Sequence, residues 1–106
     1  MFLLLYEQKD SSNTPVDTLF LNFSNALSSR LQDGGLLKYY SEKIKGCEAL
    51  AGNITGIAGE TKVYYRAAVI KNGTCFYKII LGISDDYRSD YDEDMNQIIR
   101  SFSIDS

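Results

Sequence analysis

The 106 residues predict an α+β fold, in which helices or long loops cover both sides of a sheet that contains an antiparallel hairpin. The first observation is a pair of long apolar runs, residues 63–70 and 75–83, that flank Asn72 and Gly73. Asn-Gly between strand-like runs is the strongest short-range hairpin signal, because both residues readily adopt the positive φ of a type I′ turn. The second observation is that both faces of this hairpin are apolar, whereas a half-solvated hairpin has one polar face. The two strands are therefore expected inside a sheet that helices or long loops cover on both sides.

The expected two-residue turn fixes the register of the hairpin, with Ile70 opposite Cys75. Side chains then alternate between two faces. One face is expected to carry Val63, Tyr65, Ala67, Val69, Phe76 and Ile80, and the other Tyr64, Ala68, Ile70, Cys75, Tyr77, Ile79, Leu81 and Ile83. Arg66 and Lys78 interrupt the pattern, and their long stems are expected to cover apolar surface while their charges reach water.

The two cysteines, Cys47 and Cys75, fit no zinc pattern, because they are far apart and the chain has no histidine. The register places Cys75 on an apolar face, and the chain is no disulfide-dense scaffold. Two buried thiols are therefore favoured, and a disulfide is the alternative.

The first part of the chain predicts a strand over residues 2–6, a polar loop over residues 7–14 and then a helix. Thr14 is the expected N-cap and Pro15 the first helical residue, where its missing N–H is harmless. Gly34 and Gly35 are expected to end the helix in a left-handed conformation. The apolar stripe of this helix has three- and four-residue spacing and consists of Val16, Leu19, Phe20, Phe23, Leu27 and Leu31.

The middle segments are less regular. Residues 36–44 fit either a strand or a loop lying on the sheet. Residues 46–59 are short apolar pieces broken by Gly52, Gly56 and Gly59, which indicates a strand, a turn and the approach to the long hairpin.

A second helix is predicted near the C-terminus. Asp90 is the expected N-cap, Glu93 completes a capping-box-like pair, and Arg100 lies where the helix dipole favours a cation. The apolar face of this helix consists of Tyr91, Met95, Ile98, Ile99 and Phe102.

Composition indicates one globular domain over residues 1–106, with 44% hydrophobic and 24% charged residues. The net charge of −3 and the scattered Lys and Arg argue against a nucleic-acid partner.

No apolar run approaches the ~20 residues of a membrane span. Residues 1–6 lack the basic segment and cleavage site of a signal peptide, so a strand is the better interpretation.

The acidic segment over residues 85–94 is the main candidate for a binding site. It lacks the ligand spacing, central glycine and terminal glutamate of a calcium loop, so a solvated turn and helix start is favoured over a metal site. As a binding surface it offers Asp85, Asp86, Tyr87, Asp90 and Tyr91.

Signals for catalysis and cofactors are absent from the sequence. The glycine-rich residues 52–59 lack the Gly-Lys-Ser/Thr ending of a phosphate loop and are read as turn glycines. There is no Gly-x-Ser-x-Gly elbow, and without histidine a serine or cysteine nucleophile lacks its usual base. No catalytic residue, cofactor or metal ligand is therefore assigned.

A family resemblance rests on residues in the second half of the chain. The matching segments are Ile44-Lys45-Gly46-Cys47-Glu48-Ala49, residues 63–70, the Asn-Gly turn, Phe76-Tyr77-Lys78-Ile79, Asp86-Tyr87 and Gln97-Ile98-Ile99-Arg100-Ser101-Phe102. This order resembles the PsbP-like superfamily, which includes the extrinsic photosystem II subunit, envelope proteins of the DcrB type and a Ran-binding nuclear import factor. The resemblance implies an antiparallel sheet with helices on both faces, an α/β/α sandwich. The chain starts abruptly at its first strand, which leaves open that it lacks an N-terminal portion of a longer protein.

The resemblance also implies a function class. Members of this kind generally bind other proteins and share no catalytic site, so the leading hypothesis is a non-catalytic protein-binding or scaffold module of an exported or envelope-associated bacterial protein. One alternative is a small-ligand binding domain with a pocket between sheet and helices. Another is a small acidic inhibitor or immunity-type protein. The oligomeric state and the partner stay open.

Overall fold

The computed structural model describes residues 2–9 and 13–101, which form one five-stranded sheet, two α-helices and one 3₁₀ turn. In chain order these are β1 (Phe2–Lys9), α1 (Val16–Ser28), β2 (Gln32–Ile44), β3 (Cys47–Ala58), β4 (Thr61–Asn72), β5 (Cys75–Ser84), the 3₁₀ turn Asp85–Tyr87 and α2 (Arg88–Arg100). The strand order is β1-β5-β4-β3-β2 and every neighbouring pair is antiparallel. The predicted α+β class and antiparallel sheet are confirmed, and so is the interior position of β4 and β5.

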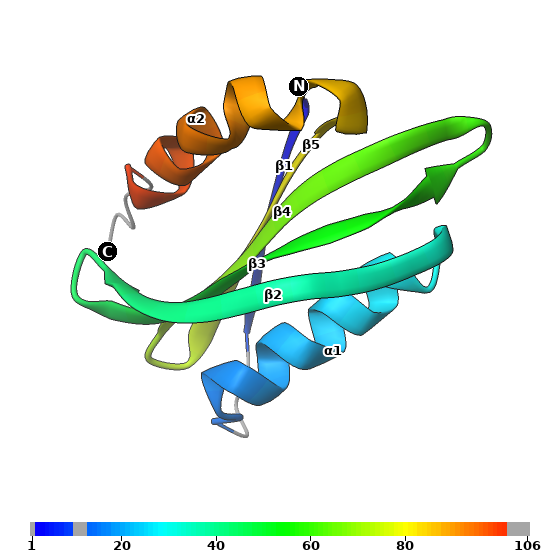
Figure 1. Ribbon diagram of the computed structural model, residues 1–106. Helices are drawn as coiled ribbons and strands as arrows, with labels where there is room; N and C mark the ends of the chain where they lie inside the picture. The colour runs from blue at the N-terminus through cyan, green and yellow to red at the C-terminus, as the bar shows by residue number, and fades with distance from the viewer. Residues whose placement is uncertain (1, 10–12, 102–106) are drawn as a thin grey trace.

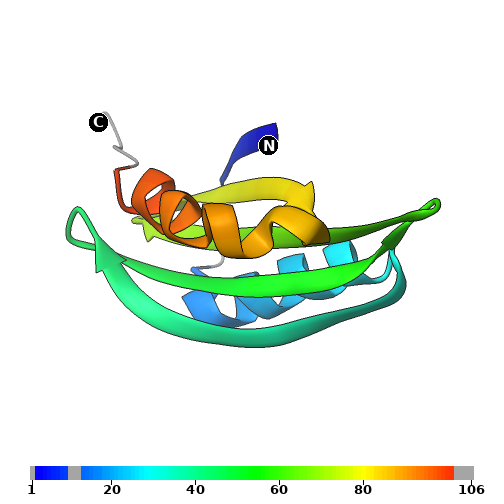
Figure 2. The same ribbon diagram turned by 45° about the horizontal axis from the view of Figure 1, so that its top comes forward.

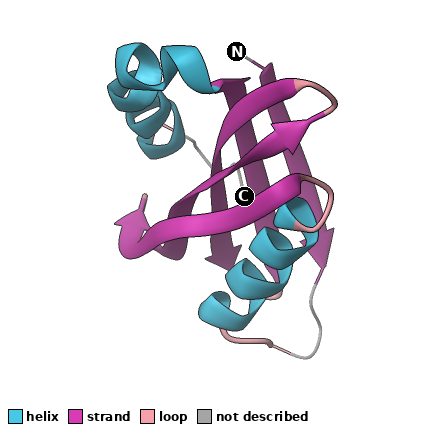
Figure 3. Ribbon diagram, turned by 45° about the vertical axis from the view of Figure 1, so that its right-hand side comes forward, coloured by secondary structure: helices cyan, strands magenta, loops and turns pink. Residues whose placement is uncertain are grey.

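The sheet is strongly twisted. Figure 3 shows β2 and β3 running at a steep angle to β1 and β5, the result of the right-handed twist that accumulates across neighbouring strands. The two α-helices lie apart from each other on the sheet (Figures 1 and 2). The helix α1 packs mainly on β2, β3 and β4, whereas α2 packs mainly on β4 and β5.

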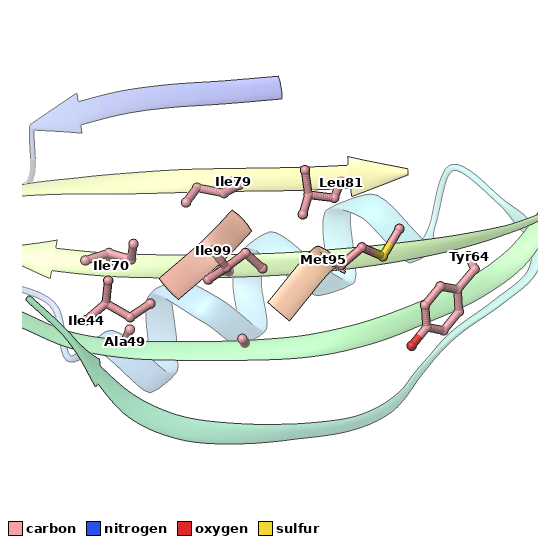
Figure 4. Close-up of a cluster of buried hydrophobic side chains, with 10 residues drawn as sticks. Ile44, Ala49, Tyr64, Ile70, Ile79, Leu81, Met95 and Ile99 are labelled. Atoms are coloured by element: carbon pink, nitrogen blue, oxygen red, sulfur yellow. The ribbon is translucent and has the colours of Figure 1, made fainter. Parts of the chain in front are cut away.

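Two apolar clusters hold the helices to the sheet. Met95 and Ile99 of α2 pack among buried residues of the strands (Figure 4). The full set of this cluster is Ile44, Ala49, Ala51, Tyr64, Ala68, Ile70, Ile79, Leu81, Met95 and Ile99. The other cluster centres on Phe20 of α1 and consists of Phe20, Leu50, Ile54, Ala67, Val69 and Phe76. The two clusters use alternate residues of β4, and alternate side chains of a strand point to opposite faces. Full burial of each large apolar side chain contributes about 1.5–3 kcal/mol.

The β4–β5 hairpin forms, but its register differs from the expected one by two residues. Asn72 pairs with Cys75, and Ile70 with Tyr77, so the turn residues are Gly73 and Thr74. Gly73 has φ of +64°, and the positive-φ residues of the described chain include neither Asn72 nor Thr74. Positive φ at the first central position only is the pattern of a type II′ turn, so the predicted type I′ turn is wrong. A shift of two residues leaves each side chain on its face, and so the buried residues match the predicted faces.

The expected burial of Cys75 is wrong for the same reason. Cys75 starts β5 beside the turn and is half-buried, as is Cys47. Both are free thiols in the structure.

The predicted bounds of the first strand and helix also need correction. The strand β1 continues to Lys9, so the polar residues 7–9 are paired with β5 and are no loop. Pro15 is the N-cap and Val16 the first helical residue, one position later than expected. The helix ends at Ser28, where the Ser28 and Ser29 hydroxyls donate to carbonyls of the last turn.

Glycines have different roles from those expected. Gly34 and Gly35 lie inside β2 and neither has positive φ, whereas Asp33, near the start of the same strand, has φ of +54°. Residues 36–44 belong to β2, and β3 runs unbroken through Gly52 and Gly56. A Cβ at Gly52 would lie 2.9 Å from Cζ of Phe20, so this glycine lets α1 approach the sheet.

The C-terminal helix begins earlier than predicted. The 3₁₀ turn leads directly into Arg88, Tyr87 is the N-cap, and no side chain caps the helix. Asp90 therefore lies in the first turn, where its charge still suits the helix dipole. On the predicted apolar face Met95 and Ile99 are buried, Tyr91 and Ile98 are exposed, and Phe102 lies outside the described residues.

Candidate functional site

A buried arginine links β4 to α2. Arg66 is 2% exposed and lies on the same face of β4 as Tyr64 and Ala68. Its guanidinium donates to the carboxylate of Asp92 and to Oδ1 of Asn96, both on α2, and to the Tyr64 hydroxyl at 3.1 Å. The expectation that the charge of Arg66 reaches water is wrong, because carboxylate and amide oxygens of α2 replace water around it.

Tyrosines complete this network. The Tyr64 hydroxyl donates to Oδ1 of Asp92 at 2.8 Å, and the Tyr40 hydroxyl donates to Oδ1 of Asn96 at 3.1 Å. The guanidinium of Arg88 lies 5.1 Å from the centroid of the Tyr64 ring, within the range of a cation–π contact. Tyr64 therefore lies between two arginines and one carboxylate.

The network shifts two pKa values. Burial raises the pKa of the Tyr64 hydroxyl above its ordinary 10.0, although the hydrogen bond from Arg66 lowers it. Burial also lowers the pKa of Arg66, but the hydrogen bond to Tyr64 and the charges of Tyr64 and Asp92 outweigh it, so that pKa is raised. At neutral pH the network therefore holds a neutral phenol and a charged guanidinium.

Two buried polar atoms beside the network lack a hydrogen-bond partner in the described part of the chain. They are Oδ1 of Asn53 and Nε of Arg66. Asn53 and Arg66 face each other across β3 and β4, and Lys38 faces Asn53 from β2. A buried acceptor without a partner costs about 1–3 kcal/mol, so a donor group that reaches Oδ1 of Asn53 is favoured here.

A groove of about 580 Å³ opens beside Asn53, between the start of α2 and the strands β2, β3 and β4. We call it the Asn53 groove, and its lining residues are Leu37, Lys38, Asn53, Tyr64, Arg88, Ser89 and Asp92. An irregularity in the β2–β3 register between Leu36 and Lys38 lies at its rim. The groove thus combines the exposed cations Lys38 and Arg88 on its walls with the unpaired amide oxygen of Asn53 at its floor.

The predicted acidic site does not form one cluster of carboxylates. Asp85 is engaged by Lys62 at 3.7 Å and by Arg88 at 3.4 Å. Asp86 and Asp90 are exposed, and neither is in an ion pair within residues 13–101. Over the described residues no three Cys, Asp or Glu side chains gather as a metal site would need.

The two tyrosines of the predicted site are exposed, Tyr87 at 54% and Tyr91 at 39%. Tyr87 lines a second groove, of about 500 Å³, at the start of β1. We call it the Phe2 groove, and its lining residues are Phe2, Thr61, Val63, Tyr65, Gly82, Ile83, Ser84 and Tyr87. The Phe2 ring covers the Cα side of Gly82 and makes an edge contact with Tyr65, with ring centroids 5.7 Å apart.

The strand β1 is an apolar edge. It pairs with β5 on one side only, and all eight of its residues are exposed. Five successive apolar residues, Phe2, Leu3, Leu4, Leu5 and Tyr6, are each 43–56% exposed. Lys78 of β5 lies over the rings of Tyr6, Phe23 and Phe76, as expected for a lysine whose stem covers apolar surface.

Sequence reasoning missed the buried Arg66 network and the exposure of β1. The sequence did carry a signal for the Arg66 network, since Arg66 shares its strand face with buried apolar residues. Asp92 and Asn96, four residues apart, flank the apolar face of α2 around Met95, so their oxygens can reach one guanidinium. For β1 the apolar pattern gave no sign of which strand lies at the edge.

Neither described α-helix is both long and apolar enough to cross a membrane. No protein-family model matches the sequence, and no curated protein matches it significantly.

Solved structures give the fold. The chain is similar to PA94 from Pseudomonas aeruginosa, a protein of unknown function that has been suggested to be a regulator, with a TM-score of 0.77 and 12% identity over 98% of this chain and 74% of PA94. It is also similar to the cyanobacterial PsbP protein CyanoP from Synechocystis sp. PCC 6803, with a TM-score of 0.76 and 13% identity over 97% of this chain and 66% of CyanoP. At such identities the likeness shows the fold alone. The predicted resemblance in fold is confirmed, and the chain has a PsbP-like fold.

Proposed function

We propose that this chain is a non-catalytic protein-binding module that binds an extended segment of a partner protein along the free edge of β1. The observation that carries the proposal is the exposure of all eight residues of an edge strand that begins with five apolar residues. An edge strand presents unpaired N–H and C=O groups, which a partner strand satisfies by β-augmentation. Natural edges usually block this with charges or proline, but β1 carries charges only at Glu7 and Lys9, near its end.

The chemistry of the partner follows from the two faces of β1. Leu3 and Leu5 pair with residues of β5 that belong to the face of α2, and Phe2 and Leu4 pair with residues of the opposite face. A partner strand therefore meets apolar surface on both of its faces. We infer an extended segment rich in Val, Ile and Leu.

The acidic segment adds a charge preference. The Phe2 groove continues the apolar surface of β1 as far as Tyr87, next to the exposed Asp86. In this proposal Asp85, Asp86, Tyr87, Asp90 and Tyr91 form the acidic end of the binding surface, and the partner segment carries Lys or Arg at that end. The net charge of −3 supports the same polarity.

The fold also suggests the kind of protein to which this module belongs. We infer one α/β/α-sandwich domain over residues 1–106, from an exported or envelope-associated bacterial protein. The support is the PsbP-like fold, shared with CyanoP and with PA94, which has been suggested to be a regulator. A binding module rather than an enzyme agrees with these neighbours.

The test is a selection from a random peptide library displayed on phage, against the whole chain. We expect enrichment of apolar, strand-forming peptides with a basic end. Peptide binding should be lost in the double variant Leu3→Lys, Leu5→Lys. The control is Leu37→Lys on β2, at the other edge of the sheet, because Leu37 is 53% exposed and Leu3 and Leu5 are 56% and 50% exposed.

Two results would overturn the proposal. One is peptides that bind the double variant as well as the unmodified chain. The other is a dimer in light scattering that the double variant abolishes, because β1 would then bind a second copy of this chain.

A further inference from the structure

We propose that the Asn53 groove is a binding site for a small carboxylate that carries a hydroxyl group next to its charge, that is, a 2-hydroxy acid. This site lies on strands β2–β4 and α2, away from β1, and is independent of the partner-binding edge. Its volume of about 580 Å³ falls within the range of small-molecule sites.

The floor of the groove favours a ligand with a hydroxyl group. Oδ1 of Asn53, a lining residue, is a buried acceptor without a hydrogen-bond partner in the described part of the chain, so it calls for a donor on the ligand. Asn53 lines the groove, whereas Arg66, opposite it in the β3–β4 register, does not, so the ligand contact falls to Oδ1 of Asn53. A hydroxyl both donates and accepts a hydrogen bond, whereas a carboxylate only accepts.

The walls of the groove favour a ligand with a negative charge. Lys38 of β2 and Arg88 of α2 line the groove from opposite sides, and both are exposed. The one carboxylate in the lining, Asp92, already accepts hydrogen bonds from Arg66 and Tyr64. Arg88 also lies 3.4 Å from Asp85, an exposed pair that a bound anion can compete with.

The start of α2 adds to the positive potential. Ser89, the second residue of α2, lines the groove, and no side chain caps this helix. The N-terminal end of a helix carries a partial positive charge that favours an anion. A carboxylate between Lys38, Arg88 and the start of α2 therefore places a 2-hydroxyl above Asn53.

Three probes of nearly equal size separate the two requirements. Lactate has the charge and the hydroxyl, propionate lacks the hydroxyl, and lactamide lacks the charge. In ¹H–¹⁵N correlation spectra of the whole chain, lactate should shift the backbone signals of Lys38 and Ser89 and the side-chain amide of Asn53. We expect lactate to bind about tenfold more tightly than propionate or lactamide, since one hydrogen bond or one exposed charge contact is of that order.

Substitutions assign the binding to the groove. Lys38→Gln should weaken lactate binding, whereas Lys43→Gln should not, because Lys43 is an exposed lysine of the same strand that does not line the groove. Asn53→Ala should remove the preference for lactate over propionate. Equal binding of lactate and propionate by the unmodified chain overturns the proposal even if the variants fail to fold. Shifts confined to residues outside the groove, or full binding by Lys38→Gln, also overturn it.

Discussion

Arg66 and Asp92 hold unequal positions in one ion pair, because the arginine side chain is 2% exposed and the carboxylate side chain 48% exposed. The arginine comes from the middle of β4 and the carboxylate from α2, so this pair and Asn96 join the helix to the sheet with polar contacts. Because the guanidinium is buried and the carboxylate is not, the two residues are expected to contribute unequally to the stability of the fold.

Removing the carboxylate should cost more stability than removing the arginine. Asp92→Asn leaves a buried guanidinium that cannot lose its charge, and we expect the free energy of unfolding to fall by roughly 2–4 kcal/mol. Arg66→Met leaves a carboxylate that water can solvate, so the loss should be smaller. Urea denaturation measures both, with exposed Asp94→Asn as the control, expected within about 0.5 kcal/mol of the unmodified chain. A larger loss in Arg66→Met than in Asp92→Asn would contradict this account.

The raised pKa of Tyr64 predicts a stability loss in alkali. The unfolded chain releases this proton near the ordinary pKa of 10.0, whereas the folded chain holds it to higher pH. Tyr64 therefore contributes stability that is complete below pH 10 and is lost as pH rises through the folded pKa. Tyr64→Phe should flatten the decline in unfolding free energy above pH 10. Tyr87→Phe, at an exposed position, should keep the steeper decline, and an unchanged slope in Tyr64→Phe would refute the assignment.

The turn between β4 and β5 depends on Gly73. Its φ of +64° suits glycine, and a β-branched residue must adopt it under strain. Gly73→Val should lower the free energy of unfolding by about 1–3 kcal/mol. Thr74→Val, in the same turn, is the control and should change little. Equal melting temperatures for the two variants would argue against a left-handed conformation at residue 73.

The acidic segment is expected to respond weakly to metal ions. Millimolar calcium or manganese should leave the melting temperature almost unchanged compared with a chelator. A site specific to the folded chain would add about 2.7 kcal/mol at a hundredfold excess over its Kd. A metal-dependent rise of several degrees that Asp86→Asn and Asp90→Asn both abolish would make this segment a metal site.

The hairpin shows what a sequence pattern can determine. The alternation of apolar residues in β4 and β5 predicted the two faces, because a face depends only on whether a position is odd or even. The register depends on which two residues form the turn. Asn72-Gly73 and Gly73-Thr74 both supply a glycine with positive φ, so local turn chemistry could not choose between them.

The functional surfaces were less predictable because they depend on distant residues. Arg66 and Asp92 are 26 residues apart, and the burial of one depends on where α2 lies. The order of strands in the sheet leaves β1 at the edge, and no local pattern in residues 2–9 encodes that order. The glycine pair at residues 34 and 35 was misread because the helix already ends at Ser28, with Ser29 as its C-cap, and these glycines belong to β2.

The strand order also has a consequence for synthesis on the ribosome. The strands β2, β3, β4 and β5 are joined by short connections, so each can pair soon after it emerges. The strand β1 emerges before all of them, yet its partner β5 emerges last. During translation β1 is thus an apolar segment without its neighbour, and it is a natural binding site for chaperones until residue 84 has left the exit tunnel.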